Sequence, residues 1–133
     1  MAMDAAADVC QIALVERHRG TGGVVNGFVS GFGYDVPCAV ASTVAHDSHH
    51  MIVVGTSKAD MALAANRLGE VGGGVTVWRE GRELALVRLP IAGLMSDAPA
   101  EEVARAAEEM VAAMDAIAQA GGISGRVAAY AIL

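Results

Sequence analysis

The sequence predicts a single α+β domain in which two main helices pack on one face of a mixed β-sheet. Its 133 residues suit one domain, since domains run to about 100–200 residues. Hydrophobic residues make up 54% of the chain but aromatic residues only 4%, so small and branched aliphatic side chains must form the core. Six stretches with strand-like patterns and two with helical spacing follow one another in the order β-β-β-β-α-β-β-α.

Four strand-like stretches fill the first part of the chain. Residues 9–16 are rich in branched side chains and partly alternate, as a half-buried strand does. Residues 24–34 contain several glycines, which favours a bulged strand or close backbone packing over a helix. Residues 38–45 and 51–55 are short apolar runs, typical of buried strands.

A helix is predicted to begin after Gly55. Ser57 is a suitable N-cap, and Asp60 lies in the first turn, where the helix dipole favours a negative charge. Residues 72–74 are glycines and end the helix, because glycine tolerates the left-handed turn found there. Its apolar stripe consists of Met61, Ala64, Ala65 and Leu68.

A β-hairpin and a second helix follow. Residues 75–78 and 83–89 are predicted strands, and residues 79–82 are the turn between them. Asp97 is the predicted N-cap of the last helix, which we expect to end at Gly121 and Gly122. The helix carries an apolar stripe of Val103, Ala107, Met110, Val111, Met114, Ile117 and Ala118.

Three segments are expected along the chain. Residues 1–8 are assigned to a disordered or cloning-derived N-terminal segment, residues 9–120 to the domain and residues 121–133 to an atypical C-terminal tail.

Charge and composition exclude several classes of protein. The net charge is −6 and only nine residues are Lys or Arg, which disfavours nucleic acid as a partner. No apolar run approaches the roughly 20 residues of a membrane span, and no secretory signal begins the chain. Cys10 and Cys38 lie in apolar text and are expected to be buried, reduced thiols. We therefore expect a cytoplasmic protein.

Two polar turns contain all four histidines of the chain. In the first turn, Glu16 and His18 would share one face if the strand persists. The second turn contains His46, Asp47 and His49, followed by His50. Imidazoles and carboxylates of this kind hold divalent metals or move protons near neutral pH, but the spacing matches no stand-alone metal motif. A metal or purine site and an ordinary solvated turn both remain open interpretations.

A third candidate is the glycine-rich segment 20–23. Its backbone amides could cradle a phosphate, although it lacks the Lys-Ser/Thr of a P-loop.

Five separated blocks resemble the C-terminal domain of bacterial adenine deaminases, over roughly residues 9 to 112. The blocks are ERHRGTG at 16–22, GFVSGFG at 27–33, STVAHDSH at 42–49, IVVGT at 52–56 and LPIAGLMSD at 89–97. The sequence departs from the family at His50, where Asn is usual, and at Arg19, where His is frequent.

The resemblance implies hydrolysis of adenine to hypoxanthine and ammonia, in purine salvage. In these amidohydrolases a manganese or iron ion, held in an N-terminal (β/α)₈ barrel, activates the attacking water. A chain of 133 residues cannot contain that barrel of about 250 residues, so no catalytic residue is assigned here. The resemblance assigns Glu16, His18, His46, Asp47 and His49 to positions near the substrate or a metal, with His46, His49 and His18 as possible ligands.

Three functions are compatible with these observations. The first is the C-terminal domain of an adenine deaminase, which acts with a barrel domain on adenine and is inactive alone. The second is a non-catalytic module for assembly or for binding purine or metal. The third is a self-contained metallohydrolase built on His18, His46, His49 and His50. The apolar surplus also predicts a homo-oligomer, because exposed apolar patches associate.

Overall fold

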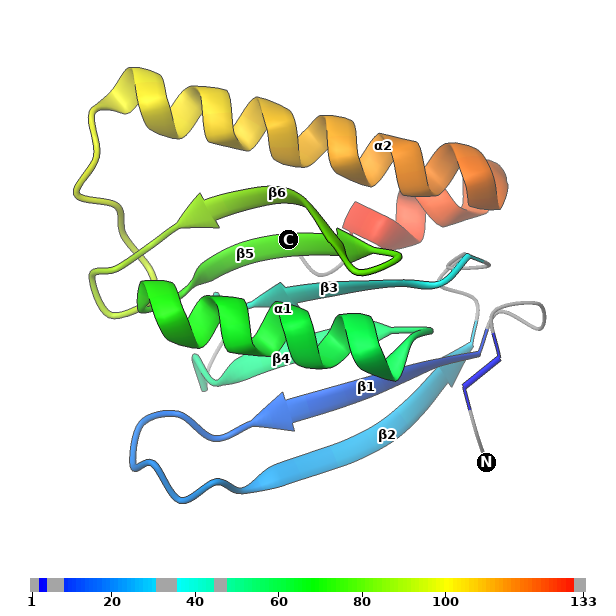
Figure 1. Ribbon diagram of the computed structural model, residues 1–133, viewed down its shortest axis with the longest axis horizontal. Coiled ribbons are helices and arrows are strands. Elements are labelled where there is room, and N and C mark those ends of the chain that lie inside the picture. The colour runs from blue at the N-terminus through cyan, green and yellow to red at the C-terminus, as the bar shows by residue number, and fades with distance from the viewer. Residues whose placement is uncertain (1–2, 5–8, 31–35, 45–47, 131–133) are drawn as a thin grey trace.

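The computed structural model contains one six-stranded sheet and two helices (Figure 1). It describes residues 3–4, 9–30, 36–44 and 48–130, with side chains up to residue 117. The strands are β1 (Val9–Val15), β2 (Val24–Ser30), β3 (Cys38–Ser42), β4 (Met51–Gly55), β5 (Gly74–Arg79) and β6 (Arg82–Arg88). The helices are α1 (Lys58–Val71) and α2 (Ala100–Tyr130). Among the described residues, no helix is both long and apolar enough to cross a membrane.

The sheet has the strand order β2-β1-β4-β3-β5-β6, and every pairing is antiparallel. The α+β class is therefore confirmed, whereas the prediction of a mixed sheet is wrong. The helical crossover from β4 through α1 to β5 joins two strands that run in the same direction. Because β3 lies between these strands and pairs with both, no parallel pairing forms.

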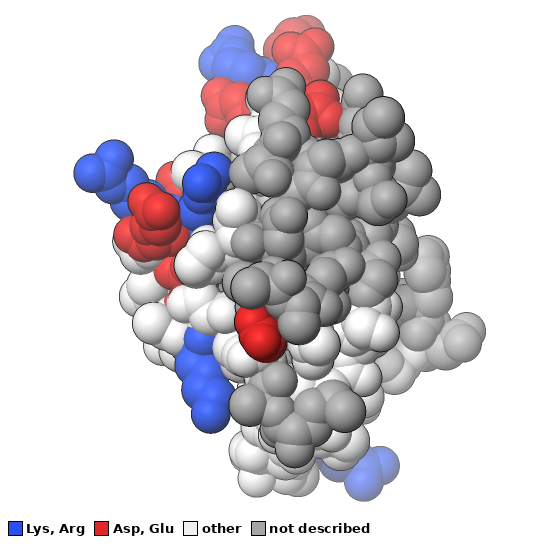
Figure 2. Space-filling model, turned by 90° about the vertical axis from the view of Figure 1, so that its right-hand side faces the viewer, with Lys and Arg blue, Asp and Glu red and all other residues white. Residues whose placement is uncertain are grey.

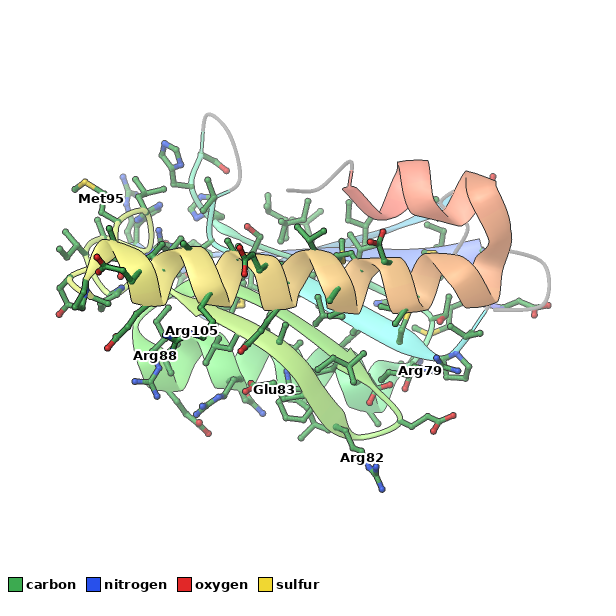
Figure 3. The ribbon with its side chains drawn as sticks, turned by 90° about the horizontal axis from the view of Figure 1, so that it is seen from above. Arg79, Arg82, Glu83, Arg88, Met95 and Arg105 are labelled. Carbon is green, nitrogen blue, oxygen red and sulfur yellow. The ribbon has the colours of Figure 1, made fainter. Side chains whose placement is uncertain are left out.

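The two helices pack on opposite faces of the sheet, which corrects the prediction of a single covered face. In Figure 1, α1 lies in front of the sheet, and Figure 3 shows α1 and α2 on different sides. Strand β3 is buried along its whole length because Ala39 and Ala41 face α1 while Val40 faces α2. Its unbroken apolar run is the sequence signal of a strand covered on both faces.

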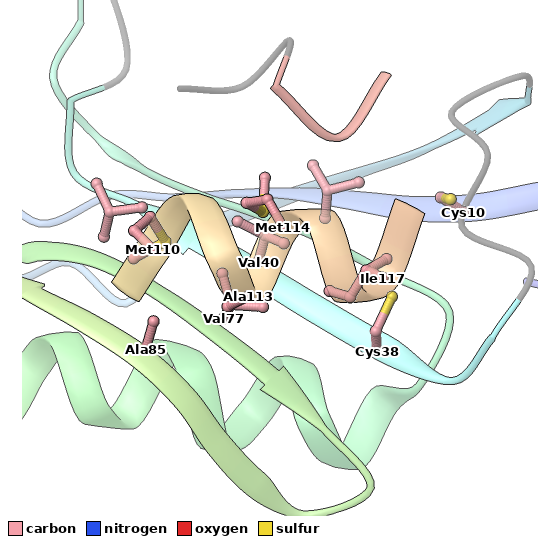
Figure 4. Packing of buried hydrophobic residues seen from close by; sticks show 11 residues of the cluster. Cys10, Cys38, Val40, Val77, Ala85, Met110, Ala113, Met114 and Ile117 are labelled. Atoms are coloured by element: carbon pink, nitrogen blue, oxygen red, sulfur yellow. The ribbon is translucent and has the colours of Figure 1, made fainter. Parts of the chain in front are cut away.

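The core consists of two aliphatic clusters, one on each face. The α2 cluster joins residues of α2 to Val40 and Val77 of the sheet (Figure 4). The α1 cluster is built mainly from alanine, valine and methionine, as the composition predicts. Cys10 and Cys38 are buried and form no disulfide, as expected.

Helix α1 begins and ends where the sequence predicts. The Ser57 hydroxyl accepts the Asp60 N–H at 3.3 Å, and Gly72 adopts the left-handed conformation at φ 85°. Asp60 also has a role that the sequence does not predict, because its buried carboxylate accepts the amides of Glu80 and Gly81 at 3.1 and 2.8 Å. These two residues form the β5–β6 turn, with positive φ at both.

Helix α2 differs from its prediction at both ends and in its buried stripe. It begins at Ala100, three residues after Asp97, and the Pro99 carbonyl accepts the amides of Glu102 and Val103. It continues through the predicted glycine stop to Tyr130, and Figure 1 shows its red end turning back. Of the predicted stripe, Met110, Met114 and Ile117 are buried but Ala107 and Val111 are exposed. Ala113 is buried instead, and the side chain of Ala118 lies outside the described residues.

Candidate functional site

Three loops meet at one end of the sheet, on the left in Figure 1. They are the β1–β2 loop, the described part of the β3–β4 loop and the segment that follows β6. We call this group, residues 16–21, 48–50 and 89–95, the loop end. The fold therefore brings together the turn that contains Glu16 and His18 and the turn that contains His49. The predicted site residues His46 and Asp47 lie outside the described residues.

Arg17 ties the three loops together. Its guanidinium donates from Nε to the His49 carbonyl at 2.7 Å and from an Nη to the Ala92 carbonyl at 2.8 Å. Both accepting residues have left-handed backbones, with φ 52° at His49 and φ 58° at Ala92. Such conformations are unfavourable for side-chain-bearing residues and persist only when the surroundings hold them. The two charge-assisted bonds of Arg17 supply that restraint.

Thr43 holds the segment that follows β6 in place. Its hydroxyl donates to the Gly93 carbonyl at 2.7 Å and accepts the Gly74 amide at 2.9 Å. A Cβ atom on Gly93 would lie 2.9 Å from this hydroxyl and 2.8 Å from the Arg17 guanidinium. Position 93 therefore has room only for glycine, which lets the loop reach Arg17.

His18 links the first turn to the second. Its Nε2 lies 2.9 Å from the Ser48 carbonyl oxygen. A carbonyl only accepts hydrogen bonds, so Nε2 of His18 is the donor, and in the neutral ring Nδ1 is then the acceptor. The His18 ring also lies beside that of His50, with 4.9 Å between ring centroids and a 48° tilt.

The Glu16 carboxylate accepts hydrogen bonds inside its own loop. It accepts the Arg19 amide at 2.6 Å, the Thr21 amide at 3.0 Å and the Thr21 hydroxyl at 3.0 Å. These bonds, those from the backbone amides of Arg19 and Thr21 foremost, lower the pKa of Glu16 to about 2. Within the predicted phosphate cradle at 20–23, the Thr21 amide therefore donates to Glu16 and the Gly23 amide to the Thr21 hydroxyl.

A cavity of about 470 Å³ opens at the loop end, lined by Glu16, His18, Arg19, Thr21 and His50. The Nδ1 atoms of His49 and His50 are buried and have no hydrogen-bond partner among the described residues. The cavity thus offers two imidazole rings, a guanidinium and a hydroxyl. Flat rings and a planar cation are the groups on which a heteroaromatic base stacks.

The predicted manganese or iron ligands are described only in part, because His46 and Asp47 lie outside the described residues. The described residues contain no group of three His, Cys, Asp or Glu side chains that could hold a metal ion. Glu16 has given its oxygens to the loop, and manganese prefers oxygen ligands to imidazole alone.

Sequence reasoning missed Arg17 and the Thr43–Gly93 contact. Arg17 stands directly between the singled-out Glu16 and His18, on the alternate face, and nothing in the sequence signals that its partners are backbone carbonyls 32 and 75 residues away. Only the fold brings those carbonyls to it.

The chain matches known proteins over most of its length. A family model described as the adenine deaminase C-terminal domain matches residues 1–123. The chain is 76% identical over 109 residues to "Adenine deaminase" of Ruegeria pomeroyi, covering 82% of this chain and 18% of that protein. It is 75% identical over 114 residues to "Adenine deaminase 3" of Rhizobium meliloti, covering 86% and 19%. For "Adenine deaminase" of Moorella thermoacetica the values are 59% over 98 residues, 74% and 16%. The chain therefore spans less than a fifth of the length of these relatives.

Proposed function

The chain belongs to the adenine deaminase C-terminal domain family, and on that premise we propose that its loop end completes the purine site of an adenine deaminase. The whole enzyme would convert adenine and water to hypoxanthine and ammonia, in purine salvage in the cytoplasm. The chemistry at the ring carbon and any manganese or iron ion belong to the part of the enzyme outside this chain. This domain would contribute side chains that contact the base.

One observation carries the proposal: two turns that are 30 residues apart in sequence are joined at a single cavity. His18 Nε2 and the Arg17 guanidinium make these bonds, and His18 lines the cavity with His50. Because Nε2 of His18 is committed to the Ser48 carbonyl, its Nδ1 remains as the acceptor, which suits the exocyclic amine of a purine. A surface of unrelated solvated turns would not be tied in this way.

The test uses a chimera in which this chain replaces the matching segment of the Ruegeria pomeroyi enzyme. We compare His46→Ala/His49→Ala and His18→Ala with the control Arg82→Ala, which lies on the β5–β6 turn. The histidine variants are expected to lower kcat/KM for adenine at least tenfold at unchanged metal content. Unchanged turnover in both histidine variants would overturn the assignment.

A second function, purine binding without turnover, is favoured by the cavity beside His18 and Arg19. Equilibrium dialysis of the isolated chain against adenine distinguishes the two. We expect no hypoxanthine from the isolated chain with Mn²⁺ or Fe²⁺ added. Adenine binding by the isolated chain that is as tight as in the chimera would favour the binding module.

A further inference from the structure

The sheet is covered unevenly. Helices α1 and α2 share core clusters with residues of β1, β3, β4, β5 and β6, whereas β2 forms an edge and, among the described strands, pairs only with β1. Three of its large apolar side chains are exposed: Val24 by 50%, Val25 by 70% and Phe28 by 40%. Val25 lies on the face of the sheet that α2 shares, and Val24 and Phe28 lie on the other, so β2 is open on both faces.

An apolar hollow adjoins this edge. It has a volume of about 330 Å³ and is lined by Ile12 and Leu14 of β1, Val25 and Gly27 of β2, and Ile52 of β4, with Asn26. Leu14 lies between Val25 and Ile52, its register partners on the neighbouring strands. These residues, together with Val24 and Phe28 on the opposite face of the same edge strand, form what we call the β2 surface.

The sequence of β2 and its flanks lacks two features that protect an edge strand from pairing. No charged residue and no proline occurs from Gly20 to Tyr34. The other edge, β6, begins and ends with Arg82 and Arg88. In Figure 2, which views the end of the molecule opposite the loop end, charged side chains gather mainly over the upper and left parts, with one basic side chain at the lower right.

We propose that the β2 surface is the seat of the catalytic part of the enzyme, which precedes this domain in its relatives. The inference rests on the proposed function and adds the face through which the domain is attached. More than four-fifths of each relative lies outside the matched segment, so a large covalently linked partner exists for an apolar surface of this kind.

Continuity with the loop end favours this occupant over a second copy of the chain. Leu14 and Val25 lie at the ends of β1 and β2 that the 16–23 loop connects, and the cavity begins at Glu16 in that loop. A domain seated on β2 therefore reaches the cavity within a few residues, as a shared purine site requires. A symmetric, antiparallel pairing of two β2 edges would instead place the two loop ends at opposite ends of one joined sheet, so neither cavity would lie beside the partner's cavity.

The experiment measures amide hydrogen exchange across residues 24–30 in the chimera and in the isolated chain. We expect at least tenfold slower exchange in the chimera. The variant Val25→Glu should abolish that protection and speed protease release of the domain, while the isolated variant keeps its Tm because Val25 is exposed. The matched control is Leu63→Glu, at an equally apolar position that is 39% exposed on α1.

Equal exchange of β2 in chimera and isolated chain would overturn the inference, as would equal effects of the two glutamate variants. Protection that disappears on hundredfold dilution would assign the surface to a second copy and also overturn it. These readouts do not depend on turnover. A chimera whose histidine variants keep full activity would therefore reject the proposed function and leave the attachment face standing.

Discussion

Arg17 shows how much of the loop end depends on one side chain. Its two bonds go to carbonyls of residues with strained backbones, so the guanidinium holds conformations that the chain would otherwise leave. Arg17→Met keeps the stem of the side chain and removes both bonds. We expect it to lower the free energy of unfolding by about 1–3 kcal/mol.

Urea denaturation followed by circular dichroism measures this loss. Arg17→Lys is the informative companion, because a single ammonium cannot reproduce the planar fork that reaches both loops. A variant as stable as the wild type would show that the two carbonyls do not need their donor.

Glu16 makes the same loop sensitive to acid. Its pKa is lowered to about 2 from an ordinary value of 4.5, so its carboxylate stabilises the loop above pH 4.5. That contribution is lost as the pH falls from 4.5 through 2, because protonation removes the negative charge that strengthens the bonds from the Arg19 and Thr21 amides.

An NMR titration from pH 6 to 2 follows these two amides. Glu16→Gln should place them near their acid-form shifts already at pH 6, whereas the exposed control Glu109→Gln should not. Midpoints near 4.5 for both amides would contradict the assignment.

Cys38 is predicted to be chemically inert in the folded chain. Burial away from solvent raises its pKa to about 12 from 9.0, so the reactive thiolate is absent at neutral pH. We expect no labelling by iodoacetamide at pH 8 until urea unfolds the protein. The same shift makes stability fall as the pH rises from 9 towards 12, since the unfolded thiol ionises first. Mass spectrometry of the labelled peptide detects the outcome.

Asp60 links two elements that the sequence treats as separate. The first turn of α1 contributes the carboxylate, and the β5–β6 turn contributes two amides. Asp60→Ala leaves both amides without this acceptor in a buried position, so we expect a loss of about 2–4 kcal/mol in unfolding free energy. Asp97→Ala, an exposed position ahead of α2, should change it by less than about 0.5 kcal/mol. Equal losses of unfolding free energy in the two variants would mean that the bonds from the Glu80 and Gly81 amides to Asp60 do not stabilise the fold.

The elements themselves were largely predictable because their signals are local. The capping preferences of Ser57 and Gly72 set the start and the end of α1, and the apolar runs of β3 and β4 predict strands. The end of α2 was not predictable, because Gly121 and Gly122 allow a helix to stop but do not force it. The covered faces were also missed, although the unbroken burial of β3 follows from its sequence.

At the scale of the whole molecule, we expect the exposed β2 surface to govern association. We expect the isolated chain to self-associate weakly at high concentration, with light scattering showing a mass that rises with concentration. Val25→Glu should reduce that rise, and Leu63→Glu should leave it unchanged. A monodisperse monomer at high concentration would contradict the expectation.

The candidate site was predictable only in part, because it is assembled by topology. The sequence singles out Glu16, His18 and His49 by residue type, and the fold alone shows that Glu16 serves the loop while His18 lines the cavity. Distances between turns depend on β1 lying beside β4, which no spacing in the sequence reveals.

The carboxylate held within the 16–21 loop has a further consequence for encounters at that end of the molecule. Because Glu16 already accepts the amides of this loop, the loop backbone is ordered before any contact forms. Little conformational entropy is therefore lost when another domain packs against it. Packing of this domain against the covalently linked rest of the enzyme should then resemble rigid docking, with no slow folding step in this loop.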